Sequence, residues 1–124
     1  IVSGGTDKHL ILIDLTNKSV LGKKYARALD YAGIIANYNT MPQEMRSPLD
    51  PSALRLGTPW LTTRGMKEEQ MEQIARWMNR VMEICTPWKD LEFDEFEQHV
   101  AFSEEIRQIA EEIKALCMQF PLEV

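Results

Sequence analysis

Three apolar segments in the first half of the chain have the spacing of β-strands. The segment 9–15, HLILIDL, is a nearly continuous apolar run between polar turns, which predicts a strand buried on much of both faces. The segment 34–39 is a second strand candidate. The segment 54–56 alternates apolar, polar and apolar residues, so in a strand its two leucines share one side and Arg55 occupies the other. We therefore expect Arg55 to point away from its local core.

One helix and one long loop are predicted between these strands. Apolar residues recur at helical intervals over 23–32, which predicts a helix, and Gly33 stands where a helix commonly ends. The segment 40–52 contains three prolines among polar residues and predicts a loop. Loops of about 12 residues without structure of their own are often functional or disordered.

The second half of the chain has the spacing of helices. Apolar residues predict a helix over 67–84 that stops before Pro87. The acidic and aromatic segment 88–99 predicts one or two helical turns, and Ser103 can cap a final helix that ends at Pro121. The order of these elements predicts an α+β fold, in which helices cover a small antiparallel or mixed sheet and leave one face or edge open.

Composition limits the classes of function that the chain can have. Its 124 residues correspond to about one domain. The 14 Lys and Arg against 19 Asp and Glu give a net charge of −5, which argues against a nucleic-acid partner. No run of about 18 apolar residues and no secretory leader occur, so we expect no membrane contact and a cytoplasmic location. The start at Ile1 rather than Met leads us to expect a piece of a longer polypeptide.

The sequence offers no convincing set of catalytic or metal-binding residues. His9 and His99 have no other His or Cys at ligand spacing, so a structural or surface role is favoured for both. Cys85 and Cys117 fall at apolar helical positions, which predicts buried, reduced thiols. The glycines of 3–6, SGGT, match no phosphate-binding pattern and favour a turn.

The best candidates for a binding site are two arginines and two asparagines. Arg55 is followed at once by Gly-Thr-Pro, and its guanidinium matches a carboxylate in two parallel hydrogen bonds. The alternative for Arg55 is an ion pair within the chain. Arg64 is a weaker candidate by itself. Asn37 and Asn39 carry amides that both donate and accept hydrogen bonds, which suits the edge of a heterocycle or the turn that follows.

Three blocks, in their order and spacing, resemble the C-terminal small domain of the serine hydroxymethyltransferase family. They are VSGGTDKHL at 2–10, NYNTMP at 37–42 and LRLGTPWLTTRG at 54–65. The connecting helix and the closing helices also agree, so the resemblance covers essentially the whole chain but only part of the family's enzyme.

The resemblance implies a fold-type I enzyme that depends on pyridoxal phosphate. Such enzymes move a one-carbon unit between serine and tetrahydrofolate, with glycine and methylenetetrahydrofolate as products. The family carries the cofactor site and its lysine in a large domain that no block here matches. The resemblance therefore implies that this chain supplies no catalytic, cofactor-binding or metal-binding residue, is inactive alone, and belongs to a homodimer or homotetramer.

The resemblance also assigns roles to single residues. Arg55 falls on the family's anchor for the substrate carboxylate, and Asn39 on an asparagine that binds the pterin ring of the folate. Arg64 falls on an arginine with a supporting role near the active site. Three positions depart from the usual residues, namely Lys8 in place of Asn, Tyr38 in place of Lys, and Trp60 in place of a small residue.

Two other functions stay open on the residues alone. A free-standing α+β module could bind an amino acid through Arg55 without catalysis. A purely structural interaction domain would instead hold Arg55 in an internal ion pair.

Overall fold

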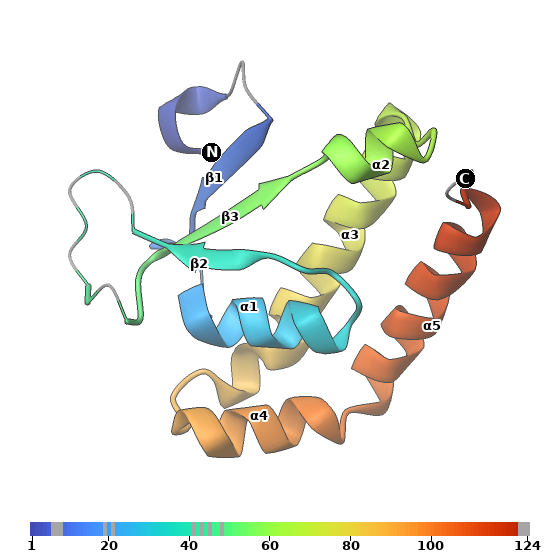
Figure 1. Cartoon of the computed structure of the whole chain (residues 1–124). Coiled ribbons are helices and arrows are strands. Elements are labelled where there is room, and N and C mark those ends of the chain that lie inside the picture. Colours follow the sequence, from blue (N-terminus) through green and yellow to red (C-terminus); the bar gives the residue numbers. More distant parts are fainter. Residues whose placement is uncertain are drawn as a thin grey trace.

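The computed structural model describes residues 1–5, 9–18, 20, 22–40, 42, 44, 46–47 and 49–121 (Figure 1). Within them lie three strands, five α-helices and two 3-10 turns, so the predicted α+β class is confirmed. In chain order they are η1 (Val2–Gly4), β1 (Leu10–Asp14), α1 (Gly22–Tyr31), β2 (Asn37–Asn39), β3 (Ala53–Gly57), α2 (Pro59–Thr63), α3 (Glu68–Cys85), η2 (Thr86–Trp88), α4 (Phe93–Ala101) and α5 (Glu104–Gln119).

The three strands form one antiparallel sheet in the order β1-β3-β2. The strand that carries Arg55 is therefore the central one. Arg55 pairs with Leu12 of β1 on one side and with Asn37 of β2 on the other. Of the two predicted sheet types, antiparallel or mixed, the antiparallel one is observed.

The core lies between one face of the sheet and the helices. In Figure 1, α1 lies directly below the sheet, α4 lies below α1, and α3 and α5 complete the helical layer. Leu54 of β3 is fully buried in the same apolar cluster as Leu29 of α1 and Phe96 of α4. Full burial of such side chains stabilises the fold by about 1.5–3 kcal/mol each, so this cluster fixes how the sheet sits on the helices.

The end of α1 explains why the second strand is shorter than predicted. Gly33 has φ +92°, and its N–H donates to Asp30, while the N–H of Ile34 donates to the carbonyl of Leu29 at 2.8 Å. This pair of bonds is a Schellman motif, which satisfies the last carbonyls of the helix. The motif uses the backbone of Ile34, so β2 begins at Asn37 rather than at residue 34.

The C-terminal helices follow the sequence patterns closely. α3 covers 68–85 against a predicted 67–84, and the Ser103 hydroxyl accepts a hydrogen bond from the N–H of Ile106 at 3.2 Å, as expected of an N-cap. The helical turns predicted within 88–99 correspond to α4 at 93–101, and the 3-10 turn η2 at 86–88 precedes them. The short helix α2 and the turn η1 were not predicted.

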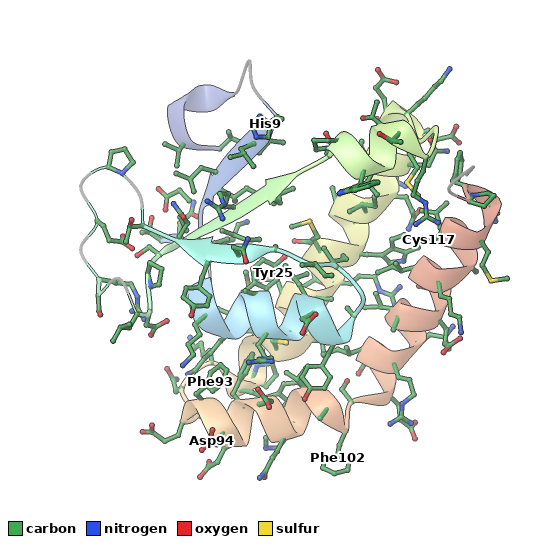
Figure 2. The ribbon with its side chains drawn as sticks, viewed as in Figure 1. His9, Tyr25, Phe93, Asp94, Phe102 and Cys117 are labelled. Atoms are coloured by element: carbon green, nitrogen blue, oxygen red, sulfur yellow. The ribbon has the colours of Figure 1, made fainter. Side chains whose placement is uncertain are left out.

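Two expectations about burial were wrong. The first strand was expected to be buried on much of both faces, but β1 lies at an edge of the sheet and its residues are only half-buried or exposed. Cys85 is buried and free as expected, whereas Cys117 is free but only partly buried because it lies on the flank of α5 (Figure 2).

Candidate functional site

One face of the sheet turns away from the helical layer and carries the candidate residues. Side chains alternate between the two faces along each strand, and the register of the three strands places eight residues on this face. We call it the open face, and it consists of Leu10, Leu12, Asp14, Asn37, Asn39, Ala53, Arg55 and Gly57, of which Ala53 alone is fully buried.

Arg55 lies at the centre of the open face. Its side chain is exposed, whereas Leu54 and Leu56 belong to the core side, so the predicted direction of Arg55 is confirmed. The four ion pairs among the described residues do not include Arg55. In the described part of the chain, its guanidinium therefore faces solvent without a carboxylate partner, which does not support the alternative of an internal ion pair.

An acidic residue lies on the same face but is engaged elsewhere. One oxygen of the Asp14 carboxylate accepts the backbone N–H of Thr16 at 2.9 Å and the Thr16 hydroxyl at 2.7 Å. The N–H bond is the larger cause, and the hydroxyl bond the next, of a lowered pKa for Asp14. Asp14 pairs with Ala53, which lies two residues before Arg55 on β3. The carboxylate thus stays charged near Arg55 without contacting it.

Asn39 shares the open face with Arg55. Its backbone pairs with Ala53, two residues before Arg55, and its side chain is partly exposed. The Asn39 amide donates to the carbonyl of Thr40 at 2.6 Å, which is the turn-type contact that the sequence left open. Tyr38 pairs with Leu54 and so lies on the opposite face, and it is 42% exposed. The departure at this position therefore does not reach the open face.

Arg64 is not on the sheet. It follows α2, and its guanidinium donates to two carbonyls at the end of α5, from Nε to Phe120 at 2.6 Å and from Nη2 to Cys117 at 2.7 Å. Positive charge at this point also complements the negative end of the α5 dipole. The structure thus brings Arg55 and Asn39 together on one face and assigns the guanidinium of Arg64 to a helix end. Trp60, at the start of α2, is 71% exposed, and Lys8 lies outside the described residues.

The histidines and cysteines among the described residues lie at separate places in the fold. His9 lies at the start of β1 (Figure 2), and His99 stacks on Trp88 with ring centroids 5.1 Å apart. Burial raises the pKa of the Cys85 thiol to about 12, so that it is not a nucleophile at neutral pH. Among the described residues, no three His, Cys, Asp or Glu side chains are grouped as metal ligands.

Glu44 was not among the predicted site residues, but the structure places its side chain in a specific contact. Its carboxylate accepts the backbone N–H of Ser52, the residue immediately before β3, at 2.5 Å. A loop carboxylate eight residues from its partner has no periodic pattern, so only the folded chain reveals this contact.

Taken together, the open face can hold an anion and orient a planar polar group, but its described residues hold no nucleophile and no lysine. A three-stranded antiparallel sheet with helices on one side is consistent with the C-terminal domain of a fold-type I enzyme. In the part of the chain that the structure covers, no helix is long and apolar enough to cross a membrane.

Sequence comparison defines the family. The profile described as Serine hydroxymethyltransferase matches residues 1–78. A protein named serine hydroxymethyltransferase from Sorangium cellulosum (strain So ce56) is 47% identical over 121 residues, which are 98% of this chain and 25% of that relative. One from Acidothermus cellulolyticus (strain ATCC 43068 / DSM 8971 / 11B) is 54% identical over 101 residues, which are 82% of this chain and 24% of the relative. This chain belongs to the serine hydroxymethyltransferase family and spans about a quarter of the length of these relatives.

Proposed function

We propose that this chain is the small C-terminal domain of a serine hydroxymethyltransferase, in which Arg55 binds the carboxylate of serine and glycine. The observation that carries the proposal is the exposed guanidinium at the centre of the open face, without a carboxylate partner among the described residues. Family membership supports the same role, because the block LRLGTP that contains Arg55 is the one that resembles the family's substrate anchor.

Arg55 suits a carboxylate for physical reasons. Its guanidinium keeps its charge at any physiological pH and donates two parallel hydrogen bonds to the two oxygens of a carboxylate. Both neighbouring strands hold the central strand, so the Cα of Arg55 is fixed by ladders on two sides. A rigidly placed anchor of this kind orients a substrate as well as binding it.

Asn39 is proposed to bind the pterin ring of tetrahydrofolate. It lies on the same face as Arg55, and an amide can both donate to and accept from the edge of a heterocycle. Its present bond to the Thr40 carbonyl uses one N–H and leaves the carbonyl oxygen of the amide available for a ligand.

The reaction itself needs groups from outside this chain. Pyridoxal phosphate, when bound, supplies the electron sink for bond cleavage at the amino-acid carbon. The open face fits the amino-acid end of such a site but not the cofactor, since its described residues offer one cation and no lysine. We therefore propose that a large domain supplies the cofactor site, and that this chain alone is inactive. A homodimer or homotetramer in the cytoplasm is part of the same proposal.

The test uses the complete polypeptide with Arg55→Ala and Arg55→Lys. Loss of a charged two-point contact should weaken glycine binding by about 2–3 kcal/mol, and lysine should restore little because it presents a single ammonium group. The matched control is Arg76→Ala, which removes an exposed arginine whose contacts are Glu72 at 3.7 Å and Gln73 at 3.3 Å on its own helix. Asn39→Ala should weaken folate binding and leave glycine binding unchanged.

Unchanged glycine binding in Arg55→Ala would disprove the proposed role of Arg55. Micromolar binding of serine by the 124-residue chain alone would favour the free-standing binding module instead. We expect that the 124-residue chain alone does not bind serine and that Arg55→Ala weakens glycine binding in the complete polypeptide.

A further inference from the structure

Three contacts converge on the two residues that precede β3. The Glu44 carboxylate accepts the N–H of Ser52 at 2.5 Å, and the Ser52 carbonyl accepts the N–H of Leu15 at 3.0 Å. The backbone of Gly22 lies against the carbonyl of Pro51, since a Cβ on Gly22 would lie 1.9 Å from that oxygen. The start of β3 is thus held by the loop, by the end of β1 and by the start of α1.

The Glu44 contact is internal rather than a surface pair. Ser52 is 1% exposed, and the second oxygen of the Glu44 carboxylate is also buried, with no hydrogen-bond partner among the described residues. A buried carboxylate that accepts a backbone N–H makes one of the stronger hydrogen bonds in proteins. Without an acceptor, the buried N–H of Ser52 would be left unsatisfied, which is costly.

The position of this contact relates it to both candidate ligand residues. The loop that carries Glu44 leaves the sheet after Asn39 and returns at Ser52, next to Ala53, and Ala53 is the register partner of Asn39. Arg55 lies two residues further along the same strand. A change at Ser52 therefore acts on the strand that carries Arg55, immediately beside the residue that pairs with Asn39.

We propose that Glu44 is a positioning residue, whose carboxylate fixes the start of β3 and so sets the spacing between Arg55 and Asn39. It contacts neither ligand. The inference rests on the proposed function, because it concerns how the amino-acid and folate contacts are held relative to one another. This role predicts that a substitution of Glu44 weakens the binding of both ligands. Arg55→Ala, in contrast, should weaken only amino-acid binding, and Asn39→Ala only folate binding.

The experiment compares Glu44→Ala and Glu44→Gln in the complete polypeptide, with separate measurements of glycine and folate dissociation constants. Glu44→Ala should raise both dissociation constants by on the order of tenfold, since small misplacements of binding groups have effects of this size or larger. Glu44→Gln keeps an acceptor oxygen and should stay within about twofold of the parent for both. The matched control is Asp50→Ala in the same loop, because among the described residues the Asp50 carboxylate pairs with Arg46 at the surface and with no backbone N–H of β3.

Amide hydrogen exchange gives a readout that does not depend on activity. The N–H of Ser52 should exchange roughly tenfold faster or more in Glu44→Ala, and at the parent rate in Glu44→Gln and Asp50→Ala. If Glu44→Ala does not fold, Glu44→Asp replaces it, because the shorter side chain keeps the charge but loses the reach and should weaken both ligands.

Several results would overturn the inference. The inference is wrong if Glu44→Ala binds both ligands with the affinity of the parent, whether or not its stability is lowered. It is also wrong if Glu44→Gln and Glu44→Ala lose the same affinity for the ligands. Arg55→Ala, run in parallel, separates the two proposals. If Arg55→Ala loses glycine binding and Glu44→Ala does not, the positioning role alone is wrong. If Arg55→Ala binds glycine normally, the proposed function itself is wrong.

Discussion

Replacement of Arg64 by methionine should destabilise the fold through the end of α5. The arginine donates to the carbonyls of Phe120 and Cys117 at 2.6 and 2.7 Å, and both carbonyls belong to the C-terminal end of that helix. Methionine keeps much of the apolar stem and removes only the charged donors. The change therefore tests the two hydrogen bonds and the charge at the helix end.

The expected size follows from those contacts. A hydrogen bond to a charged group contributes about 1.5–3 kcal/mol. Arg64 is only half-buried, however, so in the variant the two carbonyl groups can accept hydrogen bonds from water instead. We therefore expect about 1 kcal/mol for each bond, plus up to about 0.5 kcal/mol for the interaction with the helix dipole. Arg64→Met should lower the free energy of unfolding by about 2 kcal/mol, and Arg64→Lys by less.

Urea denaturation measures this loss, with Arg76→Met as the control. Arg76 is 66% exposed and pairs with Glu72 at 3.7 Å, so its loss should cost less than about 0.5 kcal/mol. The slope of the free energy against urea should stay unchanged, because no large surface is newly exposed. If Arg64→Met is no more destabilising than Arg76→Met, or if it weakens serine binding in the complete polypeptide at unchanged stability, the reasoning is refuted in favour of a direct role near the substrate.

Two further predictions concern the core. Gly22→Ala should lower the free energy of unfolding by about 2 kcal/mol or more, because the new Cβ would lie 1.9 Å from the Pro51 carbonyl oxygen at φ +24°, and urea denaturation would detect this. Burial raises the pKa of the Cys85 thiol from 9.0 to about 12, so the folded state keeps a proton that the unfolded state loses. This thiol should leave the free energy of unfolding unchanged below pH 9 and lower it by up to about 1.4 kcal/mol per pH unit between pH 9 and 12. Cys85→Ala should remove this dependence of the free energy of unfolding on pH. Tyr25, whose pKa burial also raises, should add to the slope only above pH 10.

Features that depend on neighbours in sequence could be predicted well. The helix end at Gly33 and the cap at Ser103 are local motifs, and both occur as expected. The direction of Arg55 followed from alternation within one strand, and its exposed position bears this out. The α+β class also followed from local patterns, because the spacing of apolar residues within each segment indicates whether it is a helix or a strand.

Features that depend on distant parts of the chain could not be predicted. Nothing local indicates that β3 lies between the other two strands, and this order is what places Asn39 beside Arg55. Arg64 bonds to residues more than 50 positions away, so its sequence neighbours gave no sign of the helix end that it caps. The Glu44 contact is closer in sequence, but it belongs to an irregular loop, where no periodicity reports which side chain turns inward.

The composition of the open face constrains whatever covers it in a longer polypeptide. Leu10 and Leu12 give this face an apolar part, Ala53 is already buried, and Arg55 lies at its centre. Covering the leucines would be favourable, but burying an unpaired guanidinium would cost several kcal/mol, more than one such leucine contributes. A covering domain must therefore bring an anion to Arg55 or leave a solvated cavity above it. On the proposed function, the substrate carboxylate is that anion.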